Sequence, residues 1–419
     1  MAATEGSDEM EPAGNVLDVL LERGFVKDTS DLEGLRARLQ RPAVVYYGCD
    51  ATAQSFHVGN QVGMMVLAWL QRFGHTPIAL MGGGTTMVGD PSGRSAERRI
   101  MTRSQIAANA DRLRPQFGRF VDFDGGAMIL DNSEWLLPLN LVEFLRDVGS
   151  KFTVNHMLAH ETYRVRLEQG GLSFLEFSYQ LLQAYDFLHL FRHHDCDFQV
   201  GGSDQWANIL AGVDLIRRTD QKEAFALVWP LITTSSGAKM GKTAAGAVWL
   251  NHELLPVYDY YQFWINTEDA DVERFLALFT FLPMHDIKRL AALPGAEIRE
   301  AKEVLAFEAT TIVHGREAAE EARRTSHALF GGDGSIVSAP SANFPRERFE
   351  SGIGVVDLAH EVGLFASRRE ARRKIDEGGL TVNGRRVANQ EMIRLEDLAT
   401  DQSLLLRAGK KHYLRVLAV

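Results

Sequence analysis

A strand-to-helix turn near the start of the chain has the residue types of a phosphate-binding site. The segment Gly48–Gly59 follows a run of β-branched and aromatic residues, and a helical pattern begins at about His57. The backbone N–H groups at a helix start attract anions. His57 and Thr52 can donate hydrogen bonds to phosphate oxygens, and Gly59 lets a ligand approach the backbone closely. The turn is therefore a candidate phosphate site, with a histidine that only caps the helix or packs at its start as the alternative.

A lysine-containing loop later in the chain could stabilise charge on a leaving group. Residues Thr233–Thr243 read Thr-Thr-Ser-Ser-Gly-Ala-Lys-Met-Gly-Lys-Thr, so Lys239 and Lys242 are three residues apart. Two cations in a loop rich in Gly and Ser suit the negative charge that develops on pyrophosphate. The loop lacks the residue order of a P-loop, and two solvated lysines are the alternative interpretation.

A third candidate site lies where another predicted strand ends. The segment Gln199–Trp206 contains the pair Gly201 and Gly202, followed by Asp204. Paired glycines let a planar base lie against the backbone, and a carboxylate just beyond them can accept hydrogen bonds from ribose hydroxyls. The alternative is that Asp204 serves only as a helix N-cap.

These three loops belong to an alternating pattern of strands and helices, which is typical of an α/β domain with a parallel sheet. Two helices with one apolar face are predicted over Val58–Phe73 and Gln205–Arg218. Because such sheets bind ligands at the carboxyl ends of their strands, the three loops are expected to form one site. Five runs are predicted to be strands: Pro42–Gly48, Thr76–Met81, Ala127–Leu130, Asp197–Gly201 and Ala224–Ile232.

Length and composition are those of a globular protein with several domains. The chain has 419 residues, which corresponds to two to four domains at roughly 100–200 residues each. A hydrophobic content of 45% and a charged content of 24% exclude wholesale disorder. No stretch approaches the roughly 18 uninterrupted apolar residues of a membrane helix, so no membrane partner is expected.

The two ends of the chain differ in charge. The first 14 residues are acidic and resemble neither a secretion signal nor a transit peptide, so a disordered tail and a cytoplasmic location are expected. The cysteines Cys49 and Cys196 suit a reducing compartment.

The net charge of the chain is −10, yet residues 351–419 hold 12 basic and 9 acidic side chains. A nucleic-acid partner is therefore expected to bind at the C-terminal end.

The C-terminal third divides into a helical region, a linker and a compact unit. Residues 256–330 show helical patterns, and Gly331–Pro345 concentrates Gly, Ser and Pro as a linker does. Beyond it, helices are predicted over Asp357–Leu364 and Ser367–Ile375, and Asn383-Gly384 predicts a two-residue hairpin turn. The second of these helices carries a basic face that is a candidate nucleic-acid-binding surface: Arg368, Arg369, Arg372, Arg373 and Lys374.

Together these motifs resemble those of the bacterial tyrosyl-tRNA synthetases, which are class I aminoacyl-tRNA synthetases. His57-Val-Gly-Asn60 resembles the H-I-G-H signature of that family, and Lys239-Met-Gly-Lys-Thr243 resembles its K-M-S-K-S loop in the K-F-G-K-[ST] form. The resemblance extends from about Tyr46 to the C-terminus. Its further motifs are Gly89–Gly93, Phe144–Gly149, Glu176–Phe187, Gly201–Trp206 and Tyr261–Thr267.

The resemblance implies a Rossmann-like parallel-sheet catalytic domain of the α/β class, an α-helical domain and a small α+β S4-like RNA-binding domain. Residues 121–163, approximately, are expected by resemblance to form a homodimer interface inside the catalytic domain. The expected division of the chain is a disordered tail over 1–14, the catalytic domain over 15–235, the catalytic loop and helical domain over 236–330, a linker over 331–350 and the S4-like domain over 351–419.

The activity that the resemblance implies is a two-step tyrosine–tRNA ligation. Tyrosine and ATP give tyrosyl-adenylate and pyrophosphate, and tyrosine then passes to the 3′-terminal adenosine of tRNA(Tyr). Mg²⁺ is expected to accompany ATP, held largely by its phosphates. The segment His193–Asp197 has metal-ligand residue types, but adjacent residues of an extended segment point to opposite sides, so no protein metal site is expected.

Carried over residue by residue, the resemblance assigns a tyrosine site and an ATP site. The tyrosine site has Tyr46 and Asp186 at the phenol, Asp90, Tyr179 and Gln183 at the ammonium group, and Gln205 near the carboxylate. The ATP site has Asp50, Gly59, Gly202 and Asp204 near the adenosine, Thr52 and His57 at the γ-phosphate, Lys239, Lys242 and Thr243 on the closing loop, and Arg94 and Arg98 where pyrophosphate is met.

Three positions depart from the pattern of the family. Tyr47 stands where a cysteine near the ribose is usual, Ala51 where proline is common, and Asn60 in place of the second histidine of H-I-G-H. Asn60 also resembles the H-x-G-N form of the tryptophanyl relatives, whereas Asp186 and the Gly-Ser-Asp-Gln-Trp run favour tyrosine. The alternatives are therefore a tryptophan-specific ligase, a catalytically silent RNA-binding protein and a small-molecule adenylyltransferase.

Overall fold

The computed structural model of the chain has two compact units. It describes residues 14–92, 100–169, 171–237, 240–243, 246–330, 341–399, 402–409 and 412–419. The first unit consists of Met1–Leu255 and Phe263–His314, and the second of Pro256–Gln262 and Gly315–Val419. Arg94, Arg98 and Lys239 of the expected site lie outside the described residues, as does most of the expected N-terminal tail.

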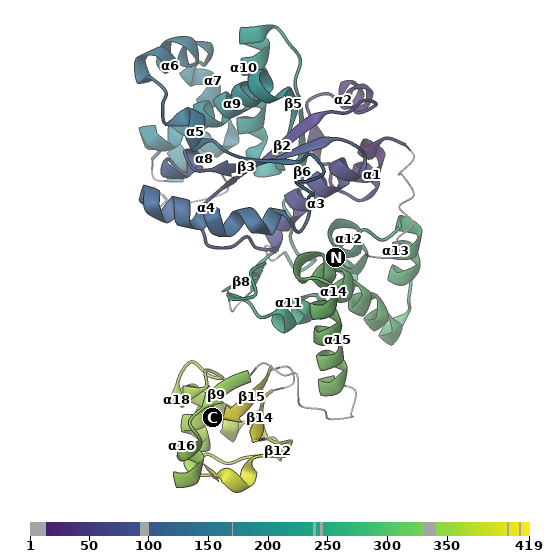
Figure 1. Cartoon of the computed structure of the whole chain (residues 1–419), viewed down its shortest axis with the longest axis vertical. Coiled ribbons are helices and arrows are strands. Elements are labelled where there is room, and N and C mark those ends of the chain that lie inside the picture. The colour runs from purple at the N-terminus through teal and green to yellow at the C-terminus, as the bar shows by residue number, and fades with distance from the viewer. Residues whose placement is uncertain are drawn as a thin grey trace. The chain divides into compact units, whose positions relative to one another are not determined.

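The first unit is built on a six-stranded sheet with the order β1-β6-β5-β2-β3-β4 (Figure 1). Five strands are parallel, and β1 pairs antiparallel with β6 at one edge. The five predicted strands are confirmed with small shifts of their ends, whereas β1 is too short to leave a sequence pattern. The strands are β1 (Asp28–Thr29), β2 (Val44–Asp50), β3 (Thr76–Gly82), β4 (Met128–Asp131), β5 (Cys196–Gly202) and β6 (Phe225–Trp229).

Helices cover both faces of this sheet. The helix α3 (Val58–Arg72) packs on β2 and β3, while α9 (Phe174–His194) and α10 (Trp206–Asp220) pack together against β5 (Figure 1). The sequence predicts α3 with a single apolar face, but nearly all of its residues are buried. The reason is that α1 (Val16–Glu22) and α12 (Val272–Phe279) contact α3 as well.

The remaining helices of the first unit surround these elements. They are α2 (Leu32–Arg38), α4 (Arg103–Phe117), α5 (Ser133–Leu136), α6 (Leu141–Asp147), α7 (Val154–Leu158), α8 (Glu161–Gln169), α13 (Met284–Ala291) and α14 (Ile298–His314). The helix α11 (Val257–Ile265) contains a boundary between the two units. In the described part of the chain, no helix has both the length and the apolar character needed to cross a membrane.

Alternation along β2 directs neighbouring side chains to different sides of the sheet. The ring of Tyr46 contacts Phe187 of α9, with ring centroids 5.4 Å apart. The ring of Tyr47 lies instead next to Gly63 of α3. Tyr46 and Tyr47 thus contact two different helices, α9 and α3. They therefore belong to different parts of the site described below.

The second unit has a five-stranded sheet in the order β12-β11-β14-β15-β9 around its own apolar core. The predicted hairpin turn is confirmed, because Asn383 and Gly384 both have positive φ angles, 47° and 81°. The elements are α15 (Arg316–Phe330), β9 (Ser341–Phe344), α16 (Arg346–Ser351), β10 (Ile353–Gly354), α17 (Val355–Glu361), α18 (Arg368–Asp376), β11 (Leu380–Val382), β12 (Arg385–Arg386), β13 (Met392–Ile393), β14 (Ser403–Ala408) and β15 (His412–Ala418).

Two expected boundaries differ from the structure. The segment 331–350, expected to be a linker, contains β9 and most of α16; β9 pairs in parallel with β15 and buries Phe344. A four-residue strand is too short to show alternation in a Gly- and Pro-rich sequence. The segment 121–163, expected to form a homodimer interface, also contains β4, which is the edge strand of the main sheet.

Candidate active site

A cleft of about 1170 Å³ opens at the carboxyl ends of the central parallel strands. It is the place where a parallel α/β sheet binds ligands. Many residues that the sequence singled out for a site line this one cleft: Tyr46, Asp50, Thr52, His57, Gly59, Asp90, Tyr179, Gln183, Asp186, Gly202, Asp204 and Gln205. The three candidate loops are thus brought together by the fold.

The lysine-containing loop lies against the start of α3. Its chain returns along the segment before α3, where the Val58 N–H donates to the Val248 carbonyl at 3.0 Å and the Leu250 N–H to the Phe56 carbonyl at 2.9 Å. Gly241 has a φ angle of 81°, and a Cβ there would lie 3.1 Å from the Gly59 nitrogen. Lys242 and Thr243 form the short strand β7 (Lys242–Thr243), which pairs with β8 (Gly246–Ala247).

The inner end of the cleft holds a buried carboxyl group. Asp186 is 2% exposed and accepts two hydrogen bonds, from the Asn132 amide at 2.8 Å and from the Trp135 indole N–H at 2.7 Å. The Tyr46 hydroxyl beside it is buried and has no hydrogen-bond partner among the described residues. We call Tyr46, Asn132, Trp135 and Asp186 the Asp186 pocket.

Burial controls the protonation of this pocket. It raises the pKa of Asp186 to about 8, although the hydrogen bonds from Asn132 and Trp135 act in the opposite direction. Burial and the nearby Asp186 charge also raise the pKa of the Tyr46 phenol well above its usual value. A buried carboxyl beside an unpartnered hydroxyl suits a ligand with a polar group at the end of an apolar body.

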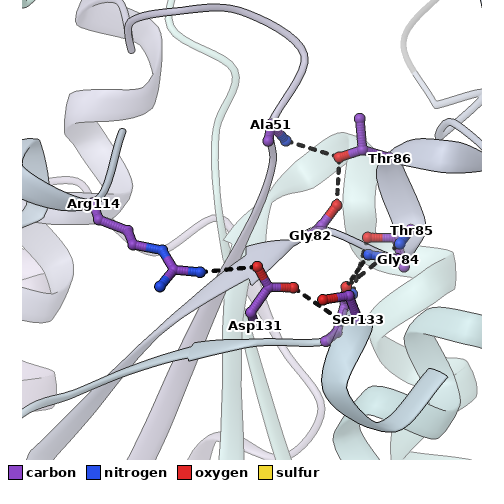
Figure 2. A network of polar contacts seen from close by, with 9 residues as sticks. Ala51, Gly82, Gly84, Thr85, Thr86, Arg114, Asp131 and Ser133 are labelled. Atoms are coloured by element: carbon purple, nitrogen blue, oxygen red, sulfur yellow. Dashed lines mark hydrogen bonds and ion pairs between the residues drawn. The ribbon is translucent and has the colours of Figure 1, made fainter. Parts of the chain in front are cut away.

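A polar network fixes the loop that follows β3 (Figure 2). The Asn132 side-chain oxygen accepts the Gly84 N–H at 2.7 Å, so one amide group supports both this loop and Asp186. Thr86 accepts the Ala51 N–H at 2.8 Å and donates to the Gly82 carbonyl. At the end of β4, Asp131 accepts hydrogen bonds from Arg114 at 3.0 Å and from the Ser133 N–H at 2.9 Å.

Two further carboxylates, Asp50 and Asp90, line the cleft outside the Asp186 pocket. Asp50 accepts hydrogen bonds from the Thr85 hydroxyl at 2.9 Å and from the Tyr179 hydroxyl at 3.3 Å. Asp90 accepts one from the Gln205 amide at 2.7 Å. Tyr179, which the resemblance groups with Asp90, lines the same cleft and donates to Asp50. Carboxylates with neutral polar neighbours suit a cationic group such as an ammonium.

The start of α3 is held by a reciprocal pair of capping hydrogen bonds. His57 is the N-cap, its Nδ1 accepts the Gly59 N–H at 3.0 Å, and the Asn60 side-chain oxygen accepts the His57 N–H at 3.1 Å. A ring nitrogen that accepts a hydrogen bond carries no proton, so the neutral ring is protonated at Nε2. We call His57, Gly59 and Asn60 the helix-start site.

The glycine pair lets Asp204 fold back against the backbone. A Cβ on Gly202 would lie 2.6 Å from an Asp204 carboxyl oxygen, so a larger residue there would force this side chain to move. Asp204 lies in a short 3-10 turn, Ser203–Gln205, and the N-cap of α10 is Gln205. The alternative interpretation of Asp204 as the cap of this helix is therefore wrong.

Several residues that build the site escaped the sequence analysis. Asn132 and Trp135 hold Asp186, and the signal available for Asn132 was the polar pair Asp131-Asn132 that follows the predicted strand Ala127–Leu130. Trp249 lines the cleft with its ring 6.3 Å from that of His57. Trp249 reaches this position because the chain turns back toward the start of α3 after the lysine-containing loop. No local sequence pattern predicts such a turn.

The predicted basic face lies on α18. Some of its cations have acidic partners: Arg368 pairs with Asp357 at 2.5 Å, and Lys374 with Glu377 at 2.9 Å. Arg369 and Arg372 are exposed on the same helix. These two arginines are the members of the face best placed to bind an external anion.

Comparisons with known proteins confirm the resemblance. Residues 38–331 match the family described as tRNA synthetases class I (W and Y), and residues 337–416 match the tyrosine–tRNA ligase SYY-like C-terminal domain. The tyrosine–tRNA ligase of Nitrobacter winogradskyi is 52% identical over 403 residues, which cover 95% of this chain and 97% of that protein. That of Clostridium kluyveri is 47% identical, covering 96% and 99%.

A solved structure agrees with these sequence matches. The C-terminally truncated mitochondrial tyrosyl-tRNA synthetase of Aspergillus nidulans superposes with a TM-score of 0.69 at 31% identity. The match covers 75% of this chain and 94% of that one. The parallel-sheet fold expected from the sequence is therefore confirmed.

Proposed function

Because the chain belongs to the class I tRNA synthetases of the tryptophan and tyrosine group, we propose that it is a tyrosine–tRNA ligase. It forms tyrosyl-adenylate and pyrophosphate from tyrosine and ATP, and transfers tyrosine to the 3′-terminal adenosine of tRNA(Tyr). The high identity to curated tyrosine–tRNA ligases over nearly the full length supports the choice of amino acid.

The observation that carries this proposal is that the Tyr46 hydroxyl and the Asp186 carboxyl group lie beside each other at the inner end of the cleft. A substrate phenol can donate its proton to the Asp186 carboxylate and accept a hydrogen bond from the Tyr46 hydroxyl. Phenylalanine would leave the buried Tyr46 hydroxyl without a partner and would not donate to Asp186, which costs binding energy. Tryptophan places its N–H elsewhere on a larger ring, so the same groups do not match it.

The remaining groups divide between the two substrates. We assign Asp90, Tyr179, Gln183 and Gln205 to the charged ends of tyrosine. Asp50, which accepts the Tyr179 hydroxyl, is assigned to the adenosine of ATP. For ATP, His57 and Thr52 face the phosphates, and Gly202 and Asp204 face the ribose and base. Lys239, Lys242, Arg94 and Arg98 supply positive charge as pyrophosphate leaves. Mg²⁺ enters with ATP, bound mainly by its phosphates.

The reaction needs no protein nucleophile. The tyrosine carboxylate attacks the α-phosphorus while the cleft holds both reactants in line, so the protein acts by positioning and by charge stabilisation. His57 Nε2–H donates to a phosphate oxygen, and the backbone N–H groups at the start of α3 add to the positive potential there.

Exchange of pyrophosphate into ATP without tRNA tests the first step. We expect exchange with tyrosine and none above background with phenylalanine or tryptophan. Exchange with tryptophan would show that the Asp186 pocket is misassigned. If no amino acid supported exchange, the alternative of a catalytically silent RNA-binding protein would stand.

The second unit is the proposed tRNA-binding part. Its exposed Arg369 and Arg372 can contact phosphates, so tRNA affinity should fall as salt concentration rises. A chain that ends at residue 330 should keep pyrophosphate exchange and lose most tRNA charging. The truncation removes β9 together with β15, because the two strands pair. Equal loss of both activities would contradict this division.

We further propose that the enzyme is a cytoplasmic homodimer. Its buried free cysteines, Cys49 and Cys196, fit a reducing compartment. Large apolar side chains are exposed on α6 and α9, including Val142 at 73% and Phe174 at 78%. Such a surface is typical of an interface. Light scattering should give the mass of a dimer, and Phe174→Asp should shift the protein toward monomer; a monomeric wild type would contradict the proposal.

A further inference from the structure

The first half of the lysine-containing loop is tied to the residues that follow it. The Gly237 N–H donates to the Thr234 carbonyl at 2.9 Å, so the chain turns sharply within the loop. The Met240 N–H donates to the Ile232 carbonyl, also at 2.9 Å, and joins the two sides of the loop at its base. A shift of the segment before Met240 is therefore passed on to the residues after it.

The residues after Met240 lie at the helix-start site. A Cβ on Gly241 would be 3.1 Å from the Gly59 nitrogen and 3.4 Å from Nδ1 of His57. Lys242 is the next residue and begins β7. The place of Lys242 relative to the helix-start site thus depends on where the whole loop is held.

One carboxylate, that of Glu268, binds two hydroxyls of the loop. The Ser235 hydroxyl donates to one of its oxygens at 2.6 Å, and the Ser236 hydroxyl donates to the other at 2.7 Å. Glu268 lies directly before the 3-10 turn Asp269–Asp271, which leads into α12. The two hydrogen bonds lower the pKa of Glu268, so the acceptor is ionised at neutral pH.

The backbone of the loop is held by two further side chains. Asp271 is 2% exposed; one of its oxygens accepts the Ser235 N–H at 2.8 Å, and the other accepts from Arg274 at 2.6 Å. Arg274 also donates to the Thr233 carbonyl. A backbone N–H and a backbone carbonyl of the loop are therefore both fixed to the start of α12.

Asp271 holds the loop although it stands where it could cap its own helix. It is the N-cap of α12, and an aspartate at this position normally accepts N–H groups of the first helical turn. Its side chain makes no such hydrogen bond, because its two oxygens are turned to Ser235 and Arg274. The side chain that could stabilise this helix start thus stabilises the loop instead.

We propose that Glu268, Asp271 and Arg274, which we call the loop clamp, are positioning residues that hold the lysine-containing loop for catalysis. The inference rests on the proposed function, since that function assigns the loop lysines to the charge of pyrophosphate. None of the three clamp residues is among the described residues that line the cleft. The clamp therefore acts through the loop and not by touching a substrate.

Glu268→Ala is the first test, because Glu268 is exposed and its loss should leave the fold intact. The contacts are exposed, so kcat of pyrophosphate exchange should fall only about threefold. KM for tyrosine and the melting temperature should stay at their wild-type values. Glu273→Ala is the matched control, since Glu273 is an exposed glutamate in the first turn of α12. It should leave kcat unchanged.

Asp271→Asn should act more strongly. The amide group offers only one acceptor where Ser235 and Arg274 both donate, so its NH₂ faces a donor. Loss of a hydrogen bond to a charged group should lower kcat about tenfold. Amide hydrogen exchange in a peptide that contains Ser235 should become faster, whereas Glu273→Ala should leave it unchanged. Wild-type kcat in both clamp variants, or amide exchange that does not respond to Asp271→Asn, would overturn the proposal.

Removal of the loop lysines tests whether the clamp acts through them. In a chain with Lys239→Ala and Lys242→Ala, single-turnover formation of tyrosyl-adenylate should be slow, and Asp271→Asn should not slow it further. Independent, multiplying effects would overturn the path through the loop. Absence of pyrophosphate exchange in the wild type would instead refute the proposed function, so the two failures are distinguishable.

Discussion

The Asp186 pocket and the helix-start site lie in one cleft but are built in different ways. In the Asp186 pocket, buried side chains hold one carboxyl group, and the donors Asn132 and Trp135 are themselves fixed. At the helix-start site, backbone N–H groups and the imidazole of His57 carry the binding potential. The first recognises a particular chemical group, whereas the second attracts any suitably placed anion.

This difference explains where the sequence has freedom to vary. A backbone N–H stays in place whatever side chain stands beside it, so the helix-start site tolerates Asn60, whose side chain accepts the His57 N–H. A buried carboxyl cannot lose a partner without leaving a polar group unsatisfied. We therefore expect substitutions in the Asp186 pocket to change KM for tyrosine. Substitutions at the helix-start site should instead change the rate at which ATP reacts to form tyrosyl-adenylate.

Asp186→Asn should have the largest effect. The amide cannot accept the indole N–H, the Asn132 amide and a substrate phenol as the carboxylate does. KM for tyrosine should rise about 1000-fold, which corresponds to roughly 4 kcal/mol. Pyrophosphate exchange at varied tyrosine concentrations measures it, with KM for ATP as the internal control. A tryptophan-specific enzyme would hardly respond, so a small effect would contradict the assignment of the Asp186 pocket to tyrosine.

The same variant should stabilise the empty enzyme at alkaline pH. Burial raises the pKa of Asp186 from its ordinary 3.8 to about 8, so the folded chain keeps a proton that the unfolded chain releases. The free energy of unfolding therefore falls as pH rises between these values. Urea unfolding should show an advantage of Asp186→Asn that grows from pH 5 to pH 8.5. An advantage independent of pH would contradict this assignment.

His57→Ala should affect the other half of the comparison. Loss of the Nε2 donor should lower kcat for tyrosyl-adenylate formation about 100-fold, as removal of one preorganised donor typically does. KM for tyrosine should stay within twofold, because the Asp186 pocket is untouched. His285→Ala is the control, since that exposed histidine lies outside the cleft. A change confined to KM for tyrosine would contradict the assignment of the helix-start site to ATP and of the Asp186 pocket to tyrosine.

Asn132→Ala should have an intermediate effect. It removes one donor to Asp186 and the acceptor of the Gly84 N–H, so the carboxyl loses its orientation. KM for tyrosine should rise about tenfold, the cost of one hydrogen bond to a charged group. Trp135→Phe removes the other donor and should act similarly. An unchanged KM for tyrosine in both variants would show that Asp186 needs neither donor.

The sequence predicted the sheet and the cleft because both leave local patterns. The run Val44–Asp50 is β-branched and aromatic, and the glycine pair before Asp204 marks a close approach of backbone and side chain. The support of Asp186 could not be predicted in this way. Asn132 and Trp135 meet Asp186 only because the segment after β4 packs against α9, more than 50 positions away in the sequence.

The boundaries of the second unit show a different limit. Ser341–Phe344 becomes a strand because β15 offers a partner, and four residues carry too little pattern to announce it. The short edge strand β1 escaped prediction for the same reason. Long-range pairing decides such segments, whereas the hairpin at Asn383 and Gly384 is decided by local backbone preference and was predicted.

The pH dependence of KM for tyrosine should show the smallest effect. With the pKa of Asp186 at about 8, the ionised fraction rises from roughly 10% at pH 7 to about half at pH 8. Because the phenol donates to the ionised carboxylate, KM for tyrosine should fall about fivefold over this interval, while KM for ATP should stay nearly constant. Initial rates of pyrophosphate exchange at both pH values measure the two constants.

Asn132→Ala sharpens this last experiment. The Asn132 amide stabilises the ionised form, so its removal should raise the pKa of Asp186 further and move the fall in KM to higher pH. His57→Ala should leave the tyrosine profile where it is, since His57 lies at the helix-start site. If KM for tyrosine rose between pH 7 and pH 8, the phenol would be binding the protonated carboxyl, and Tyr46 rather than Asp186 would be the group that selects the substrate.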